Sequence, residues 1–461
     1  MSQRLEKLFR VCFGSRIKQF EGIRGPTPKF PFGTLRAISE AELEGKRPWD
    51  VFAGYEKEYG AITLFWYFGS PIVVLNDAEL IREVLVDKPQ DYYKDDPVTA
   101  FTPVLESTEF DVNGPEWKRL RKLEPISMEG FDEWLPTQAS VIKKVVDTHL
   151  ARLTASDTHV DLLPTMERMV YDVYNECIVG QQLDDKAYQS FYTTSNMATK
   201  RMELPKWVLI PPLDPRFWYA RQYHFGAFEK IVAETKRHLY TDANDLLHRY
   251  LRKAPDVSDK QVAQFLGNIH AGGVFPAATA LVNTLYLLNR TPDVAAKLSS
   301  QLAAAESRGS APEESPFLDC VLRESMRFLP PVPMFFRNVL KTKPAHLGKY
   351  LLPADTKINI VVQGVHRSSK YWQDPDVFDP SRWEKGIIDA KSLDSDRYLP
   401  FGRGPRICVG ATLAMFCMKV MLATIRTGAR VAIDSHLAYR QFNHCGVAEP
   451  LGLRGRFVPH E

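Results

Sequence analysis

The amino-acid sequence predicts a mainly α-helical fold with small β-sheets (α+β), built as one large domain. From about residue 78 to residue 329 the chain follows a mostly helical pattern, with loops at 90–113, 204–217 and 304–316. Alternating, β-branched runs precede this region, and short strand-like runs return near 349–363. The chain shows no internal repeat, low-complexity tract or interdomain linker, which favours a single domain.

The composition is that of an ordinary globular protein. Of 461 residues, 44% are hydrophobic and 25% are charged, which suffices for a large core. The net charge of +3 gives no reason to expect a nucleic-acid partner. No stretch reaches the ~18 apolar residues of a membrane-spanning helix. The cysteines form no CxxC pair, so we expect free thiols in a reducing, cytoplasmic compartment. They are Cys12, Cys177, Cys320, Cys408, Cys417 and Cys445.

Residues 1–24 are predicted to form an amphipathic N-terminal segment. Apolar residues between Leu5 and Phe13 follow one helical stripe, with basic residues beside it. Such a helix either lies on a membrane surface or docks on its own protein, so we expect at most a peripheral membrane contact. The segment lacks the apolar core and the small-residue cleavage site of a signal peptide.

The main domain is predicted to cover residues 25–461. It opens with the proline-rich stretch GPTPKFPFG, which disfavours helix and favours an extended path. The runs AITLFWYF and PIVVLN follow, and their alternation predicts a β-hairpin around Gly69 and Ser70.

The stretch FGRGPRICVG, residues 401–410, places Cys408 in a loop of glycines and arginines ahead of an apolar segment. Three roles are open for this thiol: a structural group, a catalytic nucleophile or a metal ligand. The neighbouring residues supply no base to activate a nucleophile, although His444, distant in sequence, stays a candidate. A zinc site needs further ligands at short spacing, and none occur here.

The flanking residues favour ligation through a single thiolate. Gly402, Gly404 and Gly410 allow the backbone to approach a large flat partner closely. Backbone N–H groups of the loop and of the next helix can stabilise a sulfur anion, and Arg406 can offset negative charge. A thiolate opposite an open metal face is what oxygen activation by haem requires, because it pushes electron density onto the iron.

The pattern Phe401-x-x-Gly404-x-Arg406-x-Cys408-x-Gly410 resembles the haem-thiolate signature of the cytochrome P-450 family. The resemblance implies a single haem b (iron protoporphyrin IX) buried between two long helices. It also implies that Cys408 is the fifth ligand of the iron.

Two further motifs resemble a core ion-pair network of the same family. Glu324 and Arg327 share a helix face, as in the family's Glu-x-x-Arg helix. Arg382 stands in a Phe-x-Pro-x-Arg-Trp setting, where the family places a third arginine. Ser381 replaces the usual glutamate beside it, so the resemblance implies that the three-residue network survives and one side contact is lost.

A third match concerns the haem propionates. Trp117 and Arg121 resemble the family's Trp-x-x-x-Arg helix, in which both side chains hold one propionate. Arg337, after PPVPMFF, matches another propionate-binding arginine. Arginine suits this role because its planar guanidinium binds a carboxylate through two hydrogen bonds.

The helix predicted on the oxygen side departs from the family pattern. Gly272 aligns well, but Val274 and Phe275 stand where the resemblance implies an acid and a threonine. That acid–alcohol pair organises the water that delivers protons to dioxygen, a form of general acid catalysis. Pro276 follows, removes a helix N–H and frees the carbonyl of Gly272, which predicts a kink.

Other residues of this stretch are candidates for the site. His270 lies on the face of the absent acid and titrates near neutrality when unshifted, so it is a candidate proton donor. Thr279, one turn after Phe275, is a weaker candidate. Each has the alternative role of a packed residue in the helix bundle. Gly272, Gly273, Phe275 and His270 are therefore the predicted catalytic-site residues.

The stretch GGVFPAAT resembles a minority pattern found near sterol hydroxylases, bile-acid hydroxylases and prostacyclin-forming isomerases. The match is partial, because that branch usually carries asparagine at the position of Gly273. The peroxide-using fatty-acid hydroxylases carry arginine where this chain has Phe275, which argues against their substrate-carboxylate mechanism.

Three functions remain open from the sequence. The first is a monooxygenase that receives electrons from a separate ferredoxin or flavoprotein reductase. The second is an isomerase or dehydratase acting on an already oxidised substrate. The third is a non-catalytic haem-binding protein. By resemblance the pocket is mostly apolar, so we expect a lipophilic or aromatic substrate. Its predicted lining residues are Phe101, Phe110, Met197, Trp207, Phe275, Val332, Phe335 and Val447.

Overall fold

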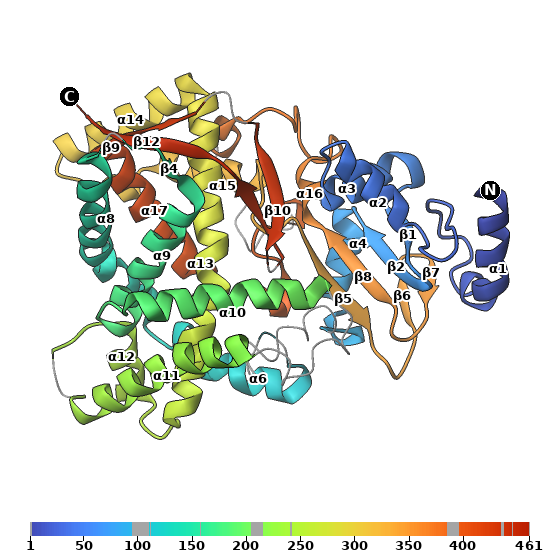
Figure 1. The fold of residues 1–461 in the computed structure, drawn as a ribbon, viewed down its shortest axis with the longest axis horizontal. Coiled ribbons are helices and arrows are strands. Elements are labelled where there is room, and N and C mark those ends of the chain that lie inside the picture. Colours follow the sequence, from blue (N-terminus) through green and yellow to red (C-terminus); the bar gives the residue numbers. More distant parts are fainter. Residues whose placement is uncertain are drawn as a thin grey trace. The chain divides into compact units, whose positions relative to one another are not determined.

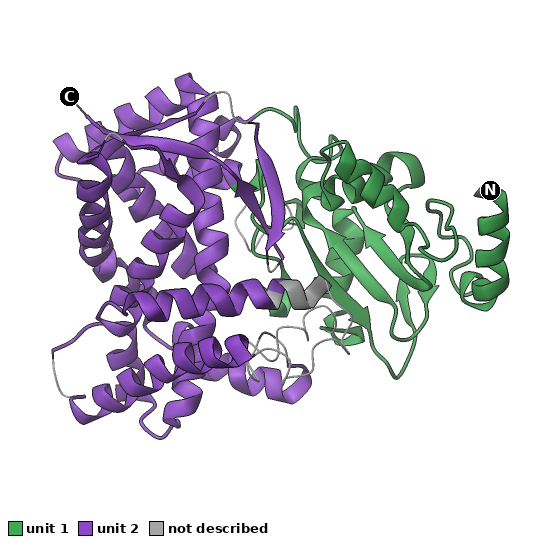
Figure 2. Cartoon of the chain, in the orientation of Figure 1, with its two compact units in different colours: residues 1–96, 326–377, 386–408 green, residues 97–325, 378–385, 409–461 purple. Residues whose placement is uncertain are grey.

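The computed structural model divides into two compact units, each made of several chain segments (Figure 1; Figure 2). It describes residues 2–94, 110, 112–156, 158–203, 215–239, 242–384, 396–434, 438–444 and 446–460. Unit 1 comprises residues 1–96, 326–377 and 386–408, and unit 2 comprises residues 97–325, 378–385 and 409–461. The architecture is mainly helical with small sheets, as predicted. The domain boundary after residue 24 lies within unit 1 and stays a prediction.

Unit 1 is built around a five-stranded sheet with the strand order β1-β2-β8-β5-β3. The strands are β1 (Ile62–Tyr67), β2 (Ser70–Leu75), β3 (Tyr92–Tyr93), β5 (Met334–Val339) and β8 (Lys357–Val361). Strands β1 and β2 pair antiparallel, with Ile62 opposite Leu75, so the predicted hairpin is confirmed. Strand β8 joins β2 in parallel, and buried aliphatic residues of both strands form the core of this unit. A second, smaller hairpin pairs β6 (Ala345–Leu347) with β7 (Tyr350–Leu352).

The helices of unit 1 pack around this sheet. They are α1 (Ser2–Lys18), α2 (Leu35–Leu43), α3 (Pro48–Tyr59), α4 (Ala78–Arg82) and α16 (Val362–His366). Helix α1 docks on its own protein: the ring of Phe9 is fully buried and lies 5.3 Å from the ring of Trp66. The outer side of α1 exposes Val11, which is 81% accessible. The internal-docking alternative for the amphipathic segment is therefore the one that the structure supports.

Unit 2 holds the long helices. They are α6 (Gly114–Leu123), α7 (Phe131–Trp134), α8 (Ala139–Thr154), α9 (Leu162–Val179), α10 (Asp185–Glu203), α11 (Pro215–Arg237), α12 (Leu246–Lys253), α13 (Asp259–Arg290), α14 (Pro292–Ser307) and α17 (Ala411–Gly428). Helix α15 (Pro316–Phe328) begins in unit 2 and ends in unit 1. Helix α13 packs against α9 and α11 and continues through Pro276 without interruption (Figure 1).

Two small sheets complete unit 2. Strands β4 (Val160–Asp161), β12 (Arg454–Pro459) and β9 (Ala429–Ile433) form one sheet in that order. Strands β10 (Arg440–His444) and β11 (Val447–Leu451) form an antiparallel hairpin that packs on α13, α9 and α10. Helices α13 and α17 are long and apolar enough to cross a membrane by composition, but 72% of the apolar window of α13 is buried inside the protein.

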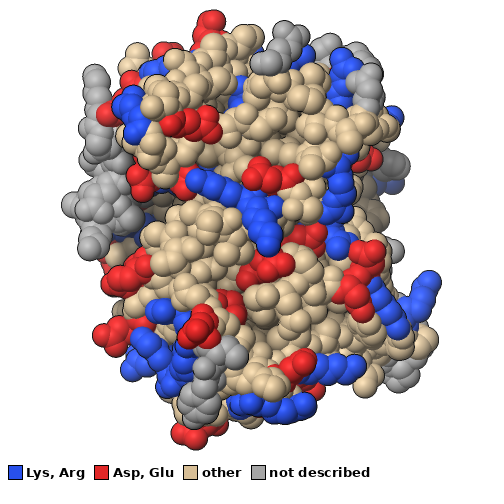
Figure 3. Space-filling view, turned by 90° about the vertical axis from the view of Figure 1, so that its left-hand side faces the viewer, with Lys and Arg blue, Asp and Glu red and all other residues tan. Residues whose placement is uncertain are grey.

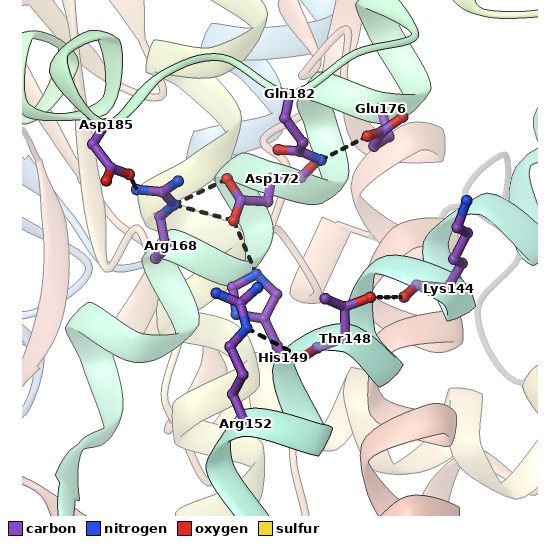
Figure 4. Close-up of polar contacts among 9 residues, drawn as sticks. All are labelled: Lys144, Thr148, His149, Arg152, Arg168, Asp172, Glu176, Gln182 and Asp185. Atoms are coloured by element: carbon purple, nitrogen blue, oxygen red, sulfur yellow. Dashed lines mark hydrogen bonds and ion pairs between the residues drawn. The ribbon is translucent and has the colours of Figure 1, made fainter.

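A buried carboxylate ties three helices of unit 2 together. Asp172 on α9 accepts hydrogen bonds from Nε2 of His149 on α8 (2.9 Å) and from Nε of Arg168 (3.0 Å) (Figure 4). Arg168 also donates to Asp185, the first residue of α10, over 2.6 Å. Figure 3 shows the face of unit 2 on the left of Figure 1, where the described acidic and basic side chains are interspersed. This pattern agrees with the small net charge of +3.

Candidate active site

The loop that carries Cys408 has a conformation that depends on its glycines. Gly402 and Gly404 have φ values of +71° and +72°, which L side chains rarely adopt. A Cβ atom on Gly404 would lie 1.9 Å from the carbonyl oxygen of Leu85, so glycine is required there. The backbone N–H of Cys408 donates to the carbonyl of Phe401 over 2.9 Å, which closes the loop. The predicted site residues Phe401 and Cys408 are thereby joined.

The thiol of Cys408 is exposed, and Gly410 caps helix α17 two residues later. The other cysteine of this region, Cys417, is fully enclosed in α17. Burial raises the pKa of the Cys417 thiol to about 12, so it stays protonated at neutral pH. Cys408 is accordingly the thiol of this region that is open to a partner. The described cysteines all carry free thiols, as expected.

Two arginines of unit 1 line one small cleft beside strands β3 and β5. Arg337, on β5, and Arg406, in the cysteine loop, line a cavity of about 30 Å³ together with Tyr92 and Tyr93. Arg337 is 8% exposed, and burial together with the charge of Arg406 lowers its pKa to about 9. Its guanidinium donates to the carbonyl of Phe336 over 2.7 Å.

This arrangement fits a group that brings carboxylates. Among the described residues, no aspartate or glutamate forms an ion pair with Arg337, although a buried guanidinium normally has one. The positive charges of Arg337 and Arg406 lie in the same cleft, so a negatively charged group bound there would be stabilised by both. The residues of unit 1 fit a haem whose propionate is held by Arg337 and Arg406.

His366 is a supporting residue that the sequence analysis missed. It is fully buried at the end of α16, and its Nε2 accepts a hydrogen bond from the backbone N–H of Leu399 over 2.8 Å. Burial lowers the pKa of His366 to about 3, so the ring stays neutral and keeps its acceptor. Leu399 lies two residues before the cysteine loop, so His366 anchors the segment that leads into that loop. The ring of Tyr398, which stacks on His366, is equally distant in the sequence, so no local pattern indicated this role.

One pair of the predicted three-residue network, Glu324 with Arg382, is present in unit 2, and the pairing of Glu324 with Arg327 stays a prediction. Glu324 is completely buried, and its Oε1 accepts from Nε of Arg382 (3.0 Å) and from the backbone N–H of Asp379 (2.9 Å). Its Oε2 accepts from Nε1 of Trp383 over 2.8 Å. Arg327, in unit 1, donates to the carbonyls of residues 366, 375 and 377. Position 381, where the glutamate is lost, holds a serine that bonds back to Asp379.

The other predicted propionate contacts lie in unit 2. Trp117 and Arg121 stand four residues apart on α6, so they share one helix face, and both are half-buried. Their role stays a prediction. Of the predicted pocket residues, Phe101 and Trp207 lie outside the described residues. Val447 is buried on β11 in unit 2.

Phe275 belongs to an aromatic cluster of unit 2. Its ring is 1% exposed and stacks on Phe191 of α10 at 5.1 Å between centroids. The ring of His444 on β10 meets it edge-on at 4.5 Å. Val274 is fully buried as well, so the two positions that replace the acid and the alcohol are occupied by packed apolar side chains.

The two central glycines of α13 differ in their surroundings. A Cβ on Gly273 would lie 2.4 Å from the ring of Tyr174, so this glycine permits close packing of α9 on α13. A Cβ on Gly272 would meet no atom within 4 Å, so open space lies beside this residue. The sequence alone did not distinguish these two neighbours.

His270 is fully buried between α13 and α9, and its ring nitrogens lie close to oxygen atoms of both helices. Its Nδ1 lies 2.9 Å from the carbonyl oxygen of Leu266 and its Nε2 lies 2.9 Å from Oδ1 of Asn175. A neutral ring has one N–H and donates to one of these two oxygens. Burial lowers the pKa of His270 to about 4, so the ring is neutral at physiological pH. Both ring nitrogens thus face oxygen atoms of unit 2. Its role as a proton donor stays a prediction.

The chain is similar to known proteins over most of its length. Residues 23–427 match the family described as Cytochrome P450. The chain is 24% identical to phenylacetaldehyde oxime monooxygenase CYP71AN24 of Prunus mume, over 86% of this chain and 78% of that protein. It is 22% identical to cytochrome P450 2C29 of Mus musculus, over 87% of this chain and 86% of that protein. The solved cytochrome P450DA heme domain matches with a TM-score of 0.81 at 16% identity, covering 95% of this chain and 98% of that one.

Proposed function

The chain belongs to the cytochrome P450 family, and we propose that it is a haem-dependent monooxygenase that oxidises a lipophilic or aromatic small molecule. Members of this family bind haem and are typically monooxygenases. The observation that carries the proposal is the loop around Cys408. An exposed thiol stands there on a glycine-dependent turn, in the same unit as the buried Arg337 and the half-buried Arg406, which line one cleft.

We assign Cys408 as the iron ligand. When bound, haem supplies the oxygen-activating iron, and a thiolate ligand favours cleavage of the O–O bond. The protein's contribution is to hold the sulfur in place. The hydrogen bond from the N–H of Cys408 to Phe401 closes the loop, and His366 anchors the segment that leads into it.

We propose further roles for the arginines and for α6. Arg337 and Arg406 neutralise one propionate, and Trp117 with Arg121 binds the other. Burial of Arg337 supports this role, because a buried guanidinium is stabilised by a carboxylate that balances its charge.

The remaining partners follow from the same proposal. Val274 and Phe275 present apolar packing on the oxygen-side helix, which supports a lipophilic substrate. The electrons come from a separate donor, a ferredoxin or a flavoprotein reductase. We place the protein in the cytoplasm, a proposal supported by the free thiols of its described cysteines.

A second candidate function is isomerisation or dehydration of an already oxidised substrate. It is favoured by one observation: the acid and alcohol positions of α13 hold the buried side chains of Val274 and Phe275. Such a reaction needs no external electrons and no delivered protons. The partial resemblance of this stretch to the sterol hydroxylase and prostacyclin synthase branch agrees with either candidate.

The first experiment is optical. Purified haem-loaded protein is reduced with dithionite and exposed to carbon monoxide, and the Soret band is recorded. We expect the red-shifted band that is characteristic of thiolate ligation, and we expect Cys408→Ser to lose it. Cys12→Ser, which changes an exposed thiol on α1, is the matched control and should keep the band. An unshifted band in freshly prepared, folded wild-type protein would contradict the assignment of Cys408.

A second experiment separates the two candidate functions. Lipophilic test compounds are supplied either with electrons and dioxygen or as preformed organic peroxides without electrons. A monooxygenase consumes electrons in response to a compound and inserts one oxygen atom. Product formed from peroxides alone, with no electron consumption in response to any compound, would favour the isomerase.

A further inference from the structure

Unit 1 contains a second cleft, which is separate from the cleft of Arg337 and Arg406. Its volume is about 310 Å³, and among the described residues the two clefts have no lining residue in common. Five segments of unit 1 meet at this second cleft: the stretch after α1, the end of α3, the start of β1, helix α4 and the turn between β6 and β7. Ligand pockets in proteins have volumes of about 300–1,000 Å³, so the second cleft has room for a small molecule.

Most of the side chains that line the second cleft are aromatic or apolar. Tyr59, Tyr350 and Leu80 are half-buried, and Ile62 is buried. Gly60 has a φ value of +101°, and a Cβ atom there would meet no other atom within 4 Å, so open space lies beside it. An apolar cavity of about 150 Å³ admits one benzene molecule. The volume of about 310 Å³ therefore suits an aromatic ring system that carries a substituent.

Two basic side chains, Arg24 and Lys349, line the same cleft, and both are exposed. Neither forms an ion pair with any of the residues that the structure describes. Among these described residues, no aspartate or glutamate lines the second cleft. The Nζ atom of Lys349 lies 5.3 Å from the centre of the Tyr350 ring, so positive charge and aromatic surface meet in one place. The charge and the lining together favour an anion that has an aromatic body.

Two acidic residues that contact lining residues of the second cleft already have partners. Glu83 accepts a hydrogen bond from the backbone N–H of Gly348 over 2.9 Å and forms an ion pair with Lys88. Glu58 forms a hydrogen bond with the phenol of Tyr59. Burial together with this bond raises the pKa of Tyr59 to about 12, so the phenol stays neutral at physiological pH. The two cations of the cleft can therefore pair with the anionic group of a bound molecule.

We propose that the second cleft binds a small aromatic carboxylate, with its ring against Tyr59 and Tyr350 and its carboxylate at Arg24 and Lys349. The planar guanidinium of Arg24 holds a carboxylate through two hydrogen bonds, and Lys349 adds a second positive charge. Binding removes the apolar surface of the ring from water and places it beside the two phenol rings. The site uses no haem, electrons or dioxygen, so this inference goes beyond the proposed monooxygenase function and does not depend on it.

The test measures binding to the haem-loaded protein by isothermal titration calorimetry at low and at high salt. The probe is naphthoate, and naphthamide, which has nearly the same shape without the charge, is the matched ligand. Arg24→Gln and Lys349→Gln each remove one cation of the second cleft. The control variant is Arg36→Gln, which removes an exposed cation from α2, outside the cleft. All three substituted side chains are exposed, so we expect the variants to fold like the wild type, and circular dichroism checks this.

We expect Arg24→Gln and Lys349→Gln each to raise the dissociation constant of naphthoate about three- to tenfold, while Arg36→Gln leaves it unchanged. Naphthamide should bind more weakly than naphthoate, and high salt should weaken naphthoate binding because the two cations are exposed. The absence of naphthoate binding would overturn the proposal. Binding that is equally strong in Arg24→Gln, Lys349→Gln and wild type would also overturn it, because the probe would then occupy another site. Failure of the proposed function is seen separately, as the loss of the carbon-monoxide band in wild type.

Discussion

Replacing Glu324 by glutamine provides the sharpest test of the network that holds α15 to the segment after Asp379. The substitution preserves size and shape, so it opens no cavity and isolates the loss of charge. In the wild type the donors to this carboxylate include the backbone N–H of Asp379, Nε of Arg382 and Nε1 of Trp383. Glutamine turns an NH₂ group towards at least one of these donors and removes the negative charge that lies opposite the largely buried guanidinium of Arg382.

The expected cost follows from this geometry. Glu324 is 0% exposed and the Arg382 side chain is 14% exposed, so the pair is effectively desolvated. Removing one partner of a buried pair costs about 3–5 kcal/mol. The matched control is Asp319→Asn, which breaks the ion pair with Arg323 one turn earlier on α15, where the side chains are 29% and 34% exposed. A pair with that exposure contributes at most about 1 kcal/mol.

The assay is urea unfolding of the haem-loaded proteins, followed by circular dichroism at one pH and one salt concentration. The free energies of unfolding are compared through the midpoints at equal slope. The reasoning would be refuted if Glu324→Gln cost no more than Asp319→Asn, since a buried and a half-exposed pair would then be equivalent.

Three further predictions concern unit 2. Burial raises the pKa of Glu167 to about 8, so between about pH 5 and 8 the folded protein retains a proton that the unfolded chain has released. This group should make the wild-type free energy of unfolding fall by up to ~1.4 kcal/mol per pH unit over that range, and Glu167→Gln, measured by denaturation at several pH values, should make the decline shallower by that contribution. Gly273→Ala should lower the free energy of unfolding by about 1–3 kcal/mol, because its methyl group meets the ring of Tyr174. The control Gly226→Ala on α11 meets nothing within 4 Å and should raise the free energy of unfolding by about 0.5–1 kcal/mol. Equal unfolding midpoints for the two variants would contradict this reasoning. Asp172→Asn should cost about 1.5–3 kcal/mol by chemical denaturation, since the buried carboxylate accepts charge-assisted bonds, and an unchanged midpoint would show that the network of Figure 4 carries little stability.

Features that depend on neighbouring residues could be predicted from the sequence. The hairpin of β1 and β2 follows from alternating β-branched residues on either side of a glycine turn. The loop before α17 follows from Gly402 and Gly404, whose positive φ angles few other residues would tolerate. Helix α13 lies within the stretch from about residue 78 to residue 329 that the apolar pattern predicts to be mostly helical.

Features that depend on contacts between distant segments were harder to predict from the sequence. The amphipathic pattern of α1 was equally compatible with a membrane surface and with a protein surface, and only the packing of Phe9 on Trp66 distinguished them. The anchoring role of His366 rests on a backbone group 33 residues away, which no local pattern indicates. His270 looked like a free titratable group until its contact with Asn175, 95 residues away, was seen.

The sequence by itself determined which residue types are present and which of them share a helix face, because backbone geometry sets the periods of helices and strands. It therefore identified Cys408, the Glu324 motif and the absence of an acid and an alcohol at positions 274 and 275. Only the tertiary structure decided which face of α13 is packed and which is open. Gly272 and Gly273 are adjacent and chemically identical, and they differ only because the ring of Tyr174 from α9 fills the space beside one of them. Packing between helices depends on all their side chains together, so no local pattern contains it.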